Sequence, residues 1–333
     1  MQILTEKPRA PELRMTEWLQ GGPLALAELR GRVILLDFWD YACVNCLHTL
    51  PYLKSWHQRY ESLGLTIIGI HAPEFQFAQA ASQVRDAVQQ LEIPYSVALD
   101  NQFLTWSRYA CKAWPTKFCI DAEGRLRAVH QGEGAYSATE RLIQTLLAEI
   151  NPKAHFPVPM TPVQGIDRPG ALCLRATPEL YCGWGRGVLE NGSNRRESSV
   201  QTYCLPDARK QDTLYLEGVW RQDKEFIEPV ETPAKLYCRY QSNRVNVVLE
   251  PTIDTTIQVL LDGEPVLKED HGQHIDFHQN QTVVKASQPG MYELIHHQQG
   301  GQEQFEEHEL VLAFETTGVK VYAFTFVGCV YSA

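Results

Sequence analysis

Short apolar runs alternate with helix-like stretches through the first 150 residues of the chain. Residues 33–36 and 65–71 are short and apolar, a pattern typical of buried strands. Residues 47–60, between them, repeat apolar side chains every three or four positions, which predicts a helix. In chain order we further predict a helix over 75–92, a strand over 95–99, a helix over 100–109, strands over 116–120 and 126–131, and a helix over 137–150. Ser137 and Glu140 have the spacing of a capping box in the last helix. This order is that of an α/β sandwich.

The pattern changes after residue 150. Residues 151–178 contain six prolines, which predicts a semi-rigid linker with little packing. Beyond them the periodicity becomes that of strands, with turn dipeptides such as Asp262-Gly263 and almost no helical pattern. The clearest runs are 235–240, 245–249, 256–261 and 319–326. We therefore expect an α/β domain at 1–150, a linker at 151–178 and an all-β jelly-roll or sandwich domain at 179–333.

Composition and charge narrow the classes of partner. The chain has 333 residues, a net charge of −10, and the apolar and charged content of an ordinary globular protein. Nucleic acid is disfavoured as a partner because its recognition requires a basic surface. No apolar run approaches the roughly 18 residues of a membrane-spanning helix, and the first residues lack the layout of a signal peptide. We expect no membrane segment and, for the chain as written, a cytoplasmic location.

The motif Cys43-Val44-Asn45-Cys46 lies where the first strand gives way to a helix. A helix N-terminus offers unpaired N–H groups and partial positive charge, so we expect a lowered pKa for Cys43, the candidate nucleophile. Cys46, one turn further, would resolve a mixed disulfide. The alternatives are half of a zinc site and a pair of inert core thiols. No second pair of zinc ligands follows in this half of the chain, and the strand-to-helix context favours redox chemistry.

The other seven cysteines are scattered without the spacing of a disulfide framework. We predict that most of them are buried core thiols, because free cysteine is among the most buried residue types. Nine cysteines is an odd number, so at least one is unpaired, and a set of free thiols fits a reducing compartment. The seven are Cys111, Cys119, Cys173, Cys182, Cys204, Cys238 and Cys329.

The segment 37–46, with Asp-Phe-Trp followed by three residues and the C-x-x-C motif, resembles thioredoxin. The stretch 110–121, centred on Trp114-Pro115-Thr116, is similar to the part of that fold that keeps a cis-proline facing the disulfide. The wider pattern resembles the TlpA/ResA-like branch. Nearly the whole chain resembles the C-terminal portion of DipZ-type proteins, where a thioredoxin-like domain precedes a β-domain similar to carbohydrate-binding modules.

The resemblance implies roles for further residues. Asp37 would be a buried acid that exchanges a proton with Cys46, although an ordinary strand-end aspartate is the alternative. Pro115 would complete the catalytic set of Cys43, Cys46 and Asp37. Substrate-binding positions would be Trp39, Trp114 and Glu74. His71 is better explained as a strand-end histidine than as a catalyst.

In the second domain, Tyr181, Trp184 and Trp220 are candidates for stacking on a sugar. The alternative is that these rings fill the core of the sandwich. A group of histidines near the C-terminus matches no standard metal-site spacing, and we therefore predict no metal. These are His271, His274, His278, His296, His297 and His308.

Together these patterns predict a thiol–disulfide oxidoreductase that needs no cofactor. Its partners would be protein or small-thiol disulfides and dithiols and an unidentified electron donor or acceptor, with carbohydrate as a further candidate. The alternative is a glycan- or protein-binding module that uses the thioredoxin-like part as a scaffold. Peroxide reduction is disfavoured because Asp40 stands where peroxiredoxins keep a threonine. The DipZ resemblance implies an extracytoplasmic location if the chain is a fragment, and Val44-Asn45 leaves the redox direction open.

Overall fold

The computed structural model describes residues 1–192 and 197–331 of the chain. Residue contacts divide it into two compact units, 1–167 and 168–333. The boundary between the units lies inside the proline-rich segment expected to be a linker. The domain limits expected from the sequence, 1–150 and 179–333, remain a prediction.

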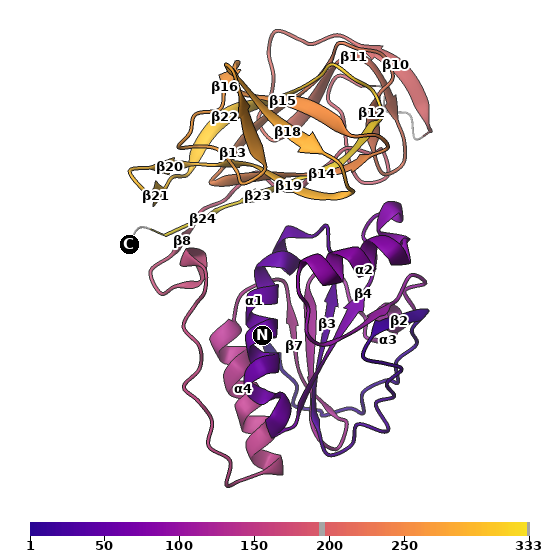
Figure 1. Ribbon diagram of the computed structural model, residues 1–333, viewed down its shortest axis with the longest axis vertical. Coiled ribbons are helices and arrows are strands. Elements are labelled where there is room, and N and C mark those ends of the chain that lie inside the picture. The colour runs from indigo at the N-terminus through magenta and orange to yellow at the C-terminus, as the bar shows by residue number, and fades with distance from the viewer. Residues whose placement is uncertain (193–196, 332–333) are drawn as a thin grey trace. The chain divides into compact units, whose positions relative to one another are not determined.

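The first unit is built on a seven-stranded sheet (Figure 1). Its central strand β3 (Val33–Trp39) is parallel to β4 (Leu65–His71) and antiparallel to β6 (Thr116–Ile120). The remaining strands are β1 (Gln2–Ile3), β2 (Glu17–Gln20), β5 (Ser96–Leu99) and β7 (Leu126–Gln131), and the strand order is β1-β7-β6-β3-β4-β5-β2. This arrangement confirms the α/β sandwich predicted from the order of elements.

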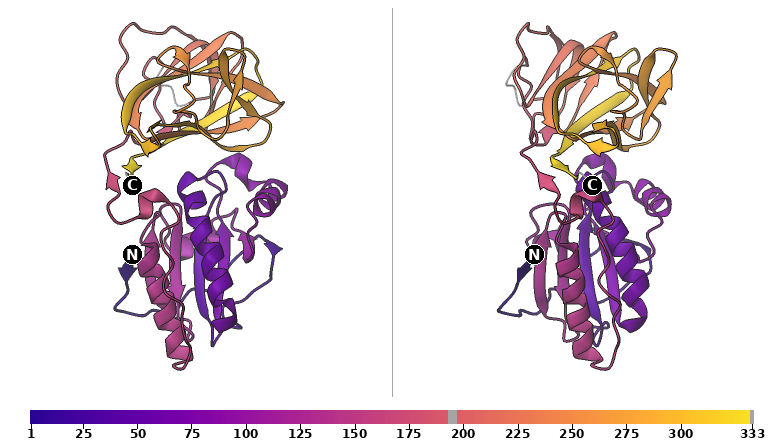
Figure 2. Two further views of the ribbon diagram at one scale, coloured as in Figure 1. Left: turned by 60° about the vertical axis from the view of Figure 1, so that its left-hand side comes forward. Right: turned by 90° about the vertical axis from the view of Figure 1, so that its left-hand side faces the viewer.

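Helices α1 (Val44–Tyr60) and α4 (Tyr136–Ile150) run side by side along the sheet (Figures 1 and 2). The rings of Tyr52 and Tyr136 stack between them with centroids 3.6 Å apart. Two shorter helices are α2 (Ala81–Gln90) and α3 (Leu104–Arg108). Among the described residues, none of the helices combines the length and apolarity needed to cross a bilayer.

The helix expected over 75–92 is interrupted. A 3₁₀ turn, η2 (Gln76–Gln79), is followed by Ala80 in an extended conformation, and α2 begins only after it. The side chains of Phe77 and Ala78 are buried, and the Asn101 side chain donates a hydrogen bond to the Gln79 carbonyl at 2.8 Å. Tertiary contacts therefore fix this turn, and the sequence period could not reveal them.

Glu140 does not form the predicted capping box. The N-cap of α4 is Ala135, without a side-chain cap bond, and the Glu140 carboxylate is fully buried instead. It accepts hydrogen bonds from Arg59 Nη1 and the Tyr60 hydroxyl, both at 2.5 Å, and from the Met160 N–H at 2.8 Å. This carboxylate thus ties α4 to α1 and to the segment that follows α4.

The proline-rich segment after α4 packs along the same two helices. Its Pro157 carbonyl accepts a hydrogen bond from Gln144 at 2.8 Å, and its Val163 N–H donates to the Tyr52 hydroxyl at 2.9 Å. The segment ends in the 3₁₀ turn η3 (Gly165–Asp167). Its first half is therefore anchored to the first unit, and does not have the loose packing expected of a linker.

Alternation along β3 decides which side chains reach the site. Ile34, Leu36 and Phe38 belong to one core cluster that includes Tyr109, which directly follows α3. Because successive side chains of a strand point to opposite faces, Asp37 points to the other face of the sheet. That face is the one that α1 and α4 cover.

In the described part of the second unit, most strands belong to two sheets that share strand β11 (Thr213–Gln222), and two short two-stranded sheets lie outside them. Residues 213–217 pair with β13 (Ala234–Ser242), and residues 220–222 pair with β12 (Ile227–Pro229). Gly218, between the two halves, has φ of +98°. Apolar side chains from both sheets, such as Leu236 and Val247, form one core. This confirms the predicted all-β sandwich.

Strands that pair with one another in the described part of the second unit run antiparallel. Besides β11 to β13 they are β8 (Leu172–Cys173), β9 (Leu180–Tyr181), β10 (Ser199–Tyr203), β14 (Arg244–Pro251), β15 (Thr255–Leu261), β16 (Glu264–Pro265), β17 (Ile275–His278), β18 (Gln281–Ala286), β19 (Gly290–His296), β20 (Gln298–Gln299), β21 (Gln302–Glu303), β22 (Glu306–Phe314), β23 (Val319–Val327) and β24 (Cys329–Val330).

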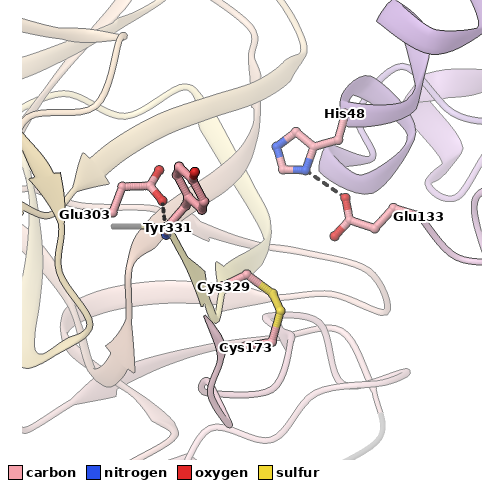
Figure 3. Close-up of a disulfide and its surroundings, with 6 residues drawn as sticks. All are labelled: His48, Glu133, Cys173, Glu303, Cys329 and Tyr331. Carbon is pink, nitrogen blue, oxygen red and sulfur yellow. Dashed lines mark hydrogen bonds and ion pairs between the residues drawn. A yellow bond between two sulfur atoms is a disulfide. The ribbon is translucent and has the colours of Figure 1, made fainter. Parts of the chain in front are cut away.

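Two of the seven cysteines outside the C-x-x-C motif are joined in a disulfide. Figure 3 shows the bond between Cys173 of β8 and Cys329 of β24, which are 156 residues apart in the sequence. Nearby, the Tyr331 N–H donates to the Glu303 carboxylate at 3.0 Å. Cys173 is exposed, so this pair is an exception to the prediction that most of the seven cysteines are buried thiols. That prediction is confirmed for Cys111, Cys119, Cys182 and Cys238, whereas Cys204 is a free but exposed thiol. The sequence could not indicate the pairing because the two strands meet only in the folded sandwich.

Candidate active site

The two motif cysteines lie at the junction between β3 and α1. Cys43 is the N-cap of α1, and its sulfur accepts a hydrogen bond from the Cys46 N–H at 3.3 Å. Cys43 retains 9% of its surface exposed, whereas Cys46 retains 1%. Both are free thiols in this structure. Both cysteines are therefore buried, and Cys43 is the less deeply buried residue of the pair.

The pKa of Cys43 is raised, although the helix N-terminus predicts a lowered value. Burial is the largest cause, the charges of Glu74 and Asp40 add to it, and hydrogen bonding with Cys46 opposes it. The pKa of Cys46 is raised well above its ordinary value, again chiefly by burial. Desolvation of the thiolate therefore outweighs the helix N-terminus. The sequence prediction failed on this point because burial depends on segments distant in the chain.

Asp40 connects the two loops beside Cys43. Its Oδ1 accepts a hydrogen bond from the Ala42 N–H at 2.7 Å, and its Oδ2 accepts one from the Glu74 N–H at 2.6 Å. Burial raises the pKa of Asp40 to about 7, against the effect of these two hydrogen bonds. His71 Nε2 lies 3.8 Å from Asp40 Oδ1, and burial lowers the pKa of His71 to about 3. The imidazole is therefore neutral at physiological pH.

Asp37 and Lys117 are register partners on β3 and β6, and each is 1% exposed. Burial raises the pKa of Asp37 to about 6, although the charge of Lys117 acts against the increase. Burial lowers the pKa of Lys117, opposed by the charges of Asp37 and Cys46. Within the described part of the chain, Asp37 Oδ1 has no hydrogen-bond partner. Lys117 was not singled out from the sequence, although a lysine inside the predicted strand 116–120 was a visible signal.

Trp114 and Pro115 lie at the edge of the sheet where β3 ends. The peptide bond between them is cis, as expected from the resemblance, and Pro115 directly precedes the register partner of Phe38. The indole N–H of Trp114 donates to the Ala72 carbonyl at 2.8 Å. Glu74 follows β4 at the same edge. The structure thus brings these residues to the end of the sheet that carries the cysteines.

Trp39 does not present a surface to a substrate. It is 1% exposed, and its ring packs edge-on against His71 with centroids 5.4 Å apart. The substrate-binding role expected for Trp39 is not supported by this placement. The ring instead forms part of the core of the first unit.

The three aromatic residues proposed for sugar binding have different environments. Trp220 is fully buried, packs against Phe314, and donates its indole N–H to the Glu217 carbonyl at 2.9 Å, so it belongs to the core. Tyr181 and Trp184 are partly exposed. Arg186 lies over the Tyr181 ring, 3.6 Å from its centroid. A sugar-binding role stays a prediction for Tyr181 and Trp184.

Two family models match the chain. The model described as the AhpC/TSA family matches residues 7–129, and the one described as a thioredoxin like C-terminal domain matches residues 177–327. DipZ of Mycobacterium tuberculosis is 34% identical over 260 residues, which are 77% of this chain and 37% of DipZ. The chain therefore spans little more than a third of the DipZ relatives that it matches.

Other similar proteins match a smaller share of the chain. The thiol-disulfide oxidoreductase ResA of Bacillus cereus is 30% identical over 146 residues, which are 44% of this chain and 79% of ResA. Among solved structures, a thiol-disulfide isomerase from Corynebacterium glutamicum has a TM-score of 0.39 and 23% sequence identity. That similarity covers 42% of this chain and 97% of the isomerase.

Proposed function

We propose that this chain, which belongs to the TlpA/ResA-like redoxin family of thiol–disulfide oxidoreductases, exchanges dithiols and disulfides through Cys43 and Cys46. The observation that carries the proposal is the geometry of the pair. Cys43 caps α1 and keeps 9% of its surface exposed, while Cys46 is buried with its N–H 3.3 Å from the Cys43 sulfur. Two adjacent thiols, of which the first is the less deeply buried, are the arrangement that a two-step exchange requires.

In the first step, the Cys43 thiolate attacks one sulfur of a substrate disulfide. The substrate S–S bond breaks as the bond to Cys43 forms, and the leaving sulfur takes the electron pair and then a proton. In the second step, Cys46 loses its proton and attacks Cys43, which closes the Cys43–Cys46 disulfide and releases the second substrate thiol. Two electrons and two protons have then passed to the substrate.

Asp37 is the proposed proton acceptor for Cys46. A carboxyl with a pKa of about 6 is ionised at neutral pH, yet close enough to neutrality to give the proton back. Its charge also acts on Cys46, whose pKa it raises. Lys117, opposite Asp37, would balance the negative charge while the proton moves.

The raised thiol pKa values favour a reductant. A strongly oxidising pair has a stabilised reduced form, whereas burial in this chain disfavours the thiolate of both cysteines. We expect a reduction potential nearer to about −270 mV than to about −120 mV. Equilibration in dithiothreitol buffers, with mass labelling of free thiols, measures it. A potential near the oxidising value would contradict the reductant role.

Substitution of each cysteine tests the mechanism on a protein disulfide substrate. Cys46→Ser should accumulate a mixed disulfide between Cys43 and the substrate, visible by mass on a non-reducing gel, and Cys43→Ser should form none. Both variants should lose turnover. The exposed free cysteine Cys204 provides the control, because Cys204→Ser should keep full activity. Turnover by Cys43→Ser, or trapping through Cys204, would refute the assignment.

We also propose an oxidising compartment for this chain. The Cys173–Cys329 disulfide supports that location, because structural disulfides persist mainly outside the reducing cytoplasm. A set of free thiols would fit a reducing compartment, and this disulfide departs from that expectation. Thiol counting on protein isolated from each compartment would test the proposal, since a reduced Cys173 in active protein would contradict it.

A further inference from the structure

Two histidines and a glutamate bring their side chains together in the second unit. The ligand atoms of His297, Glu306 and His308 all lie within 4.8 Å of one another. Glu306 and His308 are two positions apart on β22, so they project from the same face of that strand. His297 directly follows β19 and reaches the group from a different part of the sequence.

The separations are close to those around a tetrahedral metal ion. His308 Nε2 is 2.9 Å from Glu306 Oε2, and His297 Nδ1 is 3.9 Å from the same oxygen. Metal bonds of about 2.0–2.1 Å place neighbouring ligand atoms about 3.3 Å apart. Each of these two separations therefore differs from the tetrahedral value by about half an ångström, a shift within reach of side-chain rotation.

The outward-facing ring nitrogens are held by further polar groups. His308 Nδ1 lies 2.6 Å from Asp262 Oδ2, and His297 Nε2 lies 2.9 Å from the Tyr240 hydroxyl. Metal-bound histidines commonly hold their second nitrogen in this way, which fixes the ring and its tautomer. Asp270 Oδ1, 3.0 Å from His297 Nδ1, adds a fourth donor beside the group.

Backbone contacts keep the donors in place. The His297 N–H donates to the Asn243 carbonyl at 2.9 Å, and the His297 carbonyl accepts from the Gln304 N–H at 3.0 Å. His308 is the register partner of Tyr240 on β13. Glu306 is exposed, so an ion can reach the group from solvent on the side of this carboxylate.

We propose that His297, Glu306 and His308 form a binding site for a divalent transition-metal ion of the zinc class. Two imidazole nitrogens and a carboxylate oxygen are a donor set that zinc takes in proteins. Asp270 or a water molecule would supply the fourth ligand, and Asp262 and Tyr240 would orient the rings. The competing explanation is a hydrogen-bonded ion-pair network that binds no metal.

Zinc titration of the full chain tests the site, with the free thiols alkylated so that they cannot bind metal. Calorimetry against Zn²⁺ alone should give one ion per chain. Glu306→Gln and His308→Ala should each weaken binding at least tenfold, and Asp262→Asn should weaken it about 10–100-fold. His278→Ala is the matched control, an exposed histidine outside the group, and should bind as the parent does.

Substitution of Co²⁺ identifies the donors independently. The optical spectrum should show a tetrahedral ion without a thiolate charge-transfer band, and that signal should disappear in Glu306→Gln. Glu306 is exposed, so this variant keeps the test valid even where a histidine variant fails to fold. No Zn²⁺ binding by the parent, or equal binding by Glu306→Gln and His308→Ala, would leave the ion-pair network as the explanation.

Discussion

Buried charges beside the thiol pair control the chemistry of Cys43. Asp40 has a pKa of about 7 and Asp37 one of about 6, so both carboxyls change charge near the pH at which the protein would work. His71 stays neutral because burial lowers its pKa to about 3. Each shift has burial as its largest cause, which makes the site sensitive to any change of charge nearby.

Removal of the Glu74 charge should activate Cys43. The Glu74 carboxylate raises the pKa of Cys43, so Glu74→Gln should lower that pKa and increase the thiolate fraction at neutral pH. The rate of iodoacetamide alkylation of reduced protein, followed as a function of pH, measures the change. Glu92→Gln, which alters an exposed side chain on another loop, should leave the profile unchanged. An identical profile for Glu74→Gln would show that the Glu74 charge does not influence this pKa.

Asp37→Asn should stabilise the fold and slow catalysis. Because the folded pKa of Asp37 is about 6 and the ordinary value is 3.8, the folded protein holds a proton that the unfolded chain has lost between these pH values. Stability therefore falls as the pH rises through this window. At pH 7 the variant should gain up to about 3 kcal/mol in the free energy of unfolding, and at pH 4 almost nothing.

The activity of the same variant separates chemistry from stability. Loss of the proton acceptor should slow the second step about 10²-fold, with accumulation of the Cys43 mixed disulfide. Asp86→Asn, at an exposed position of α2, should change neither stability nor turnover. Asp37 Oδ1 has no hydrogen-bond partner among the described residues, so the structure gives no reason to expect that the carboxylate stabilises the fold. A lower free energy of unfolding for Asp37→Asn at pH 7 would contradict this prediction.

At the residue level, the sequence predicted where the candidate site residues lie better than it predicted their pKa values and neighbours. The C-x-x-C motif and the strand pattern placed Cys43, Cys46 and Asp37 correctly at one end of the sheet. The direction of the Cys43 shift was wrong, and the facing amine of Lys117 was missed. Both depend on which strands and loops surround the site, and local spacing carries no such information.

Strand β11 holds the two sheets of the second unit together by bending once. Its halves pair with β13 and β12, and the bend occurs at Gly218, whose φ of +98° is strained for other residues. A Cβ at this position would lie 3.0 Å from the Pro233 carbonyl oxygen and 3.2 Å from the Ala234 Cα. Both the conformation and the space at the bend therefore require glycine.

Gly218→Ala should weaken the second unit by about 2–4 kcal/mol, from the left-handed conformation and the backbone contact together. Gly263→Ala is the matched control, since it has φ of +85° but no atom within 4 Å of an added Cβ. It should cost only about 1–2 kcal/mol. Urea unfolding followed by circular dichroism compares the two. Equal losses would mean that conformation alone, and not the contact, makes glycine necessary at the bend.

Helices and strands with a regular hydrophobic period were predicted well. Elements whose limits depend on contacts with distant parts of the chain were not. The strands over 65–71 and 116–120 match β4 and β6 residue for residue. Strand β11 was absent from the predicted runs because Glu217-Gly218 interrupts its alternation. The break before α2 and the burial of Glu140 likewise depend on partners far away in the chain.

In the whole molecule, the features that the sequence could not show are those made by distant segments. The Cys173–Cys329 disulfide closes a span of 156 residues, and the His297–His308 group unites parts of β22 and the end of β19. Neither has a spacing that recurs in known motifs. The two-unit organisation, in contrast, followed from the change of period and composition after residue 150.

The disulfide should stabilise the second unit without affecting the chemistry of the first. A cross-link over 156 residues restricts the unfolded chain by up to about 5 kcal/mol in the loop-entropy model. The double variant Cys173→Ser/Cys329→Ser should therefore unfold its second unit at a lower denaturant concentration. Alkylation of Cys43 should proceed at the parental rate, because each unit has its own core.

Cys204→Ser is the control for this experiment, since it removes an exposed free thiol and leaves the cross-link intact. It should match the parent in both measurements. A double variant with unchanged stability would show that the sandwich core alone holds β8 and β24 together. A double variant with altered Cys43 reactivity would instead show that the β-sandwich acts on the thiol pair, so that the second unit would be a regulator of the exchange reaction as well as a neighbour in the chain.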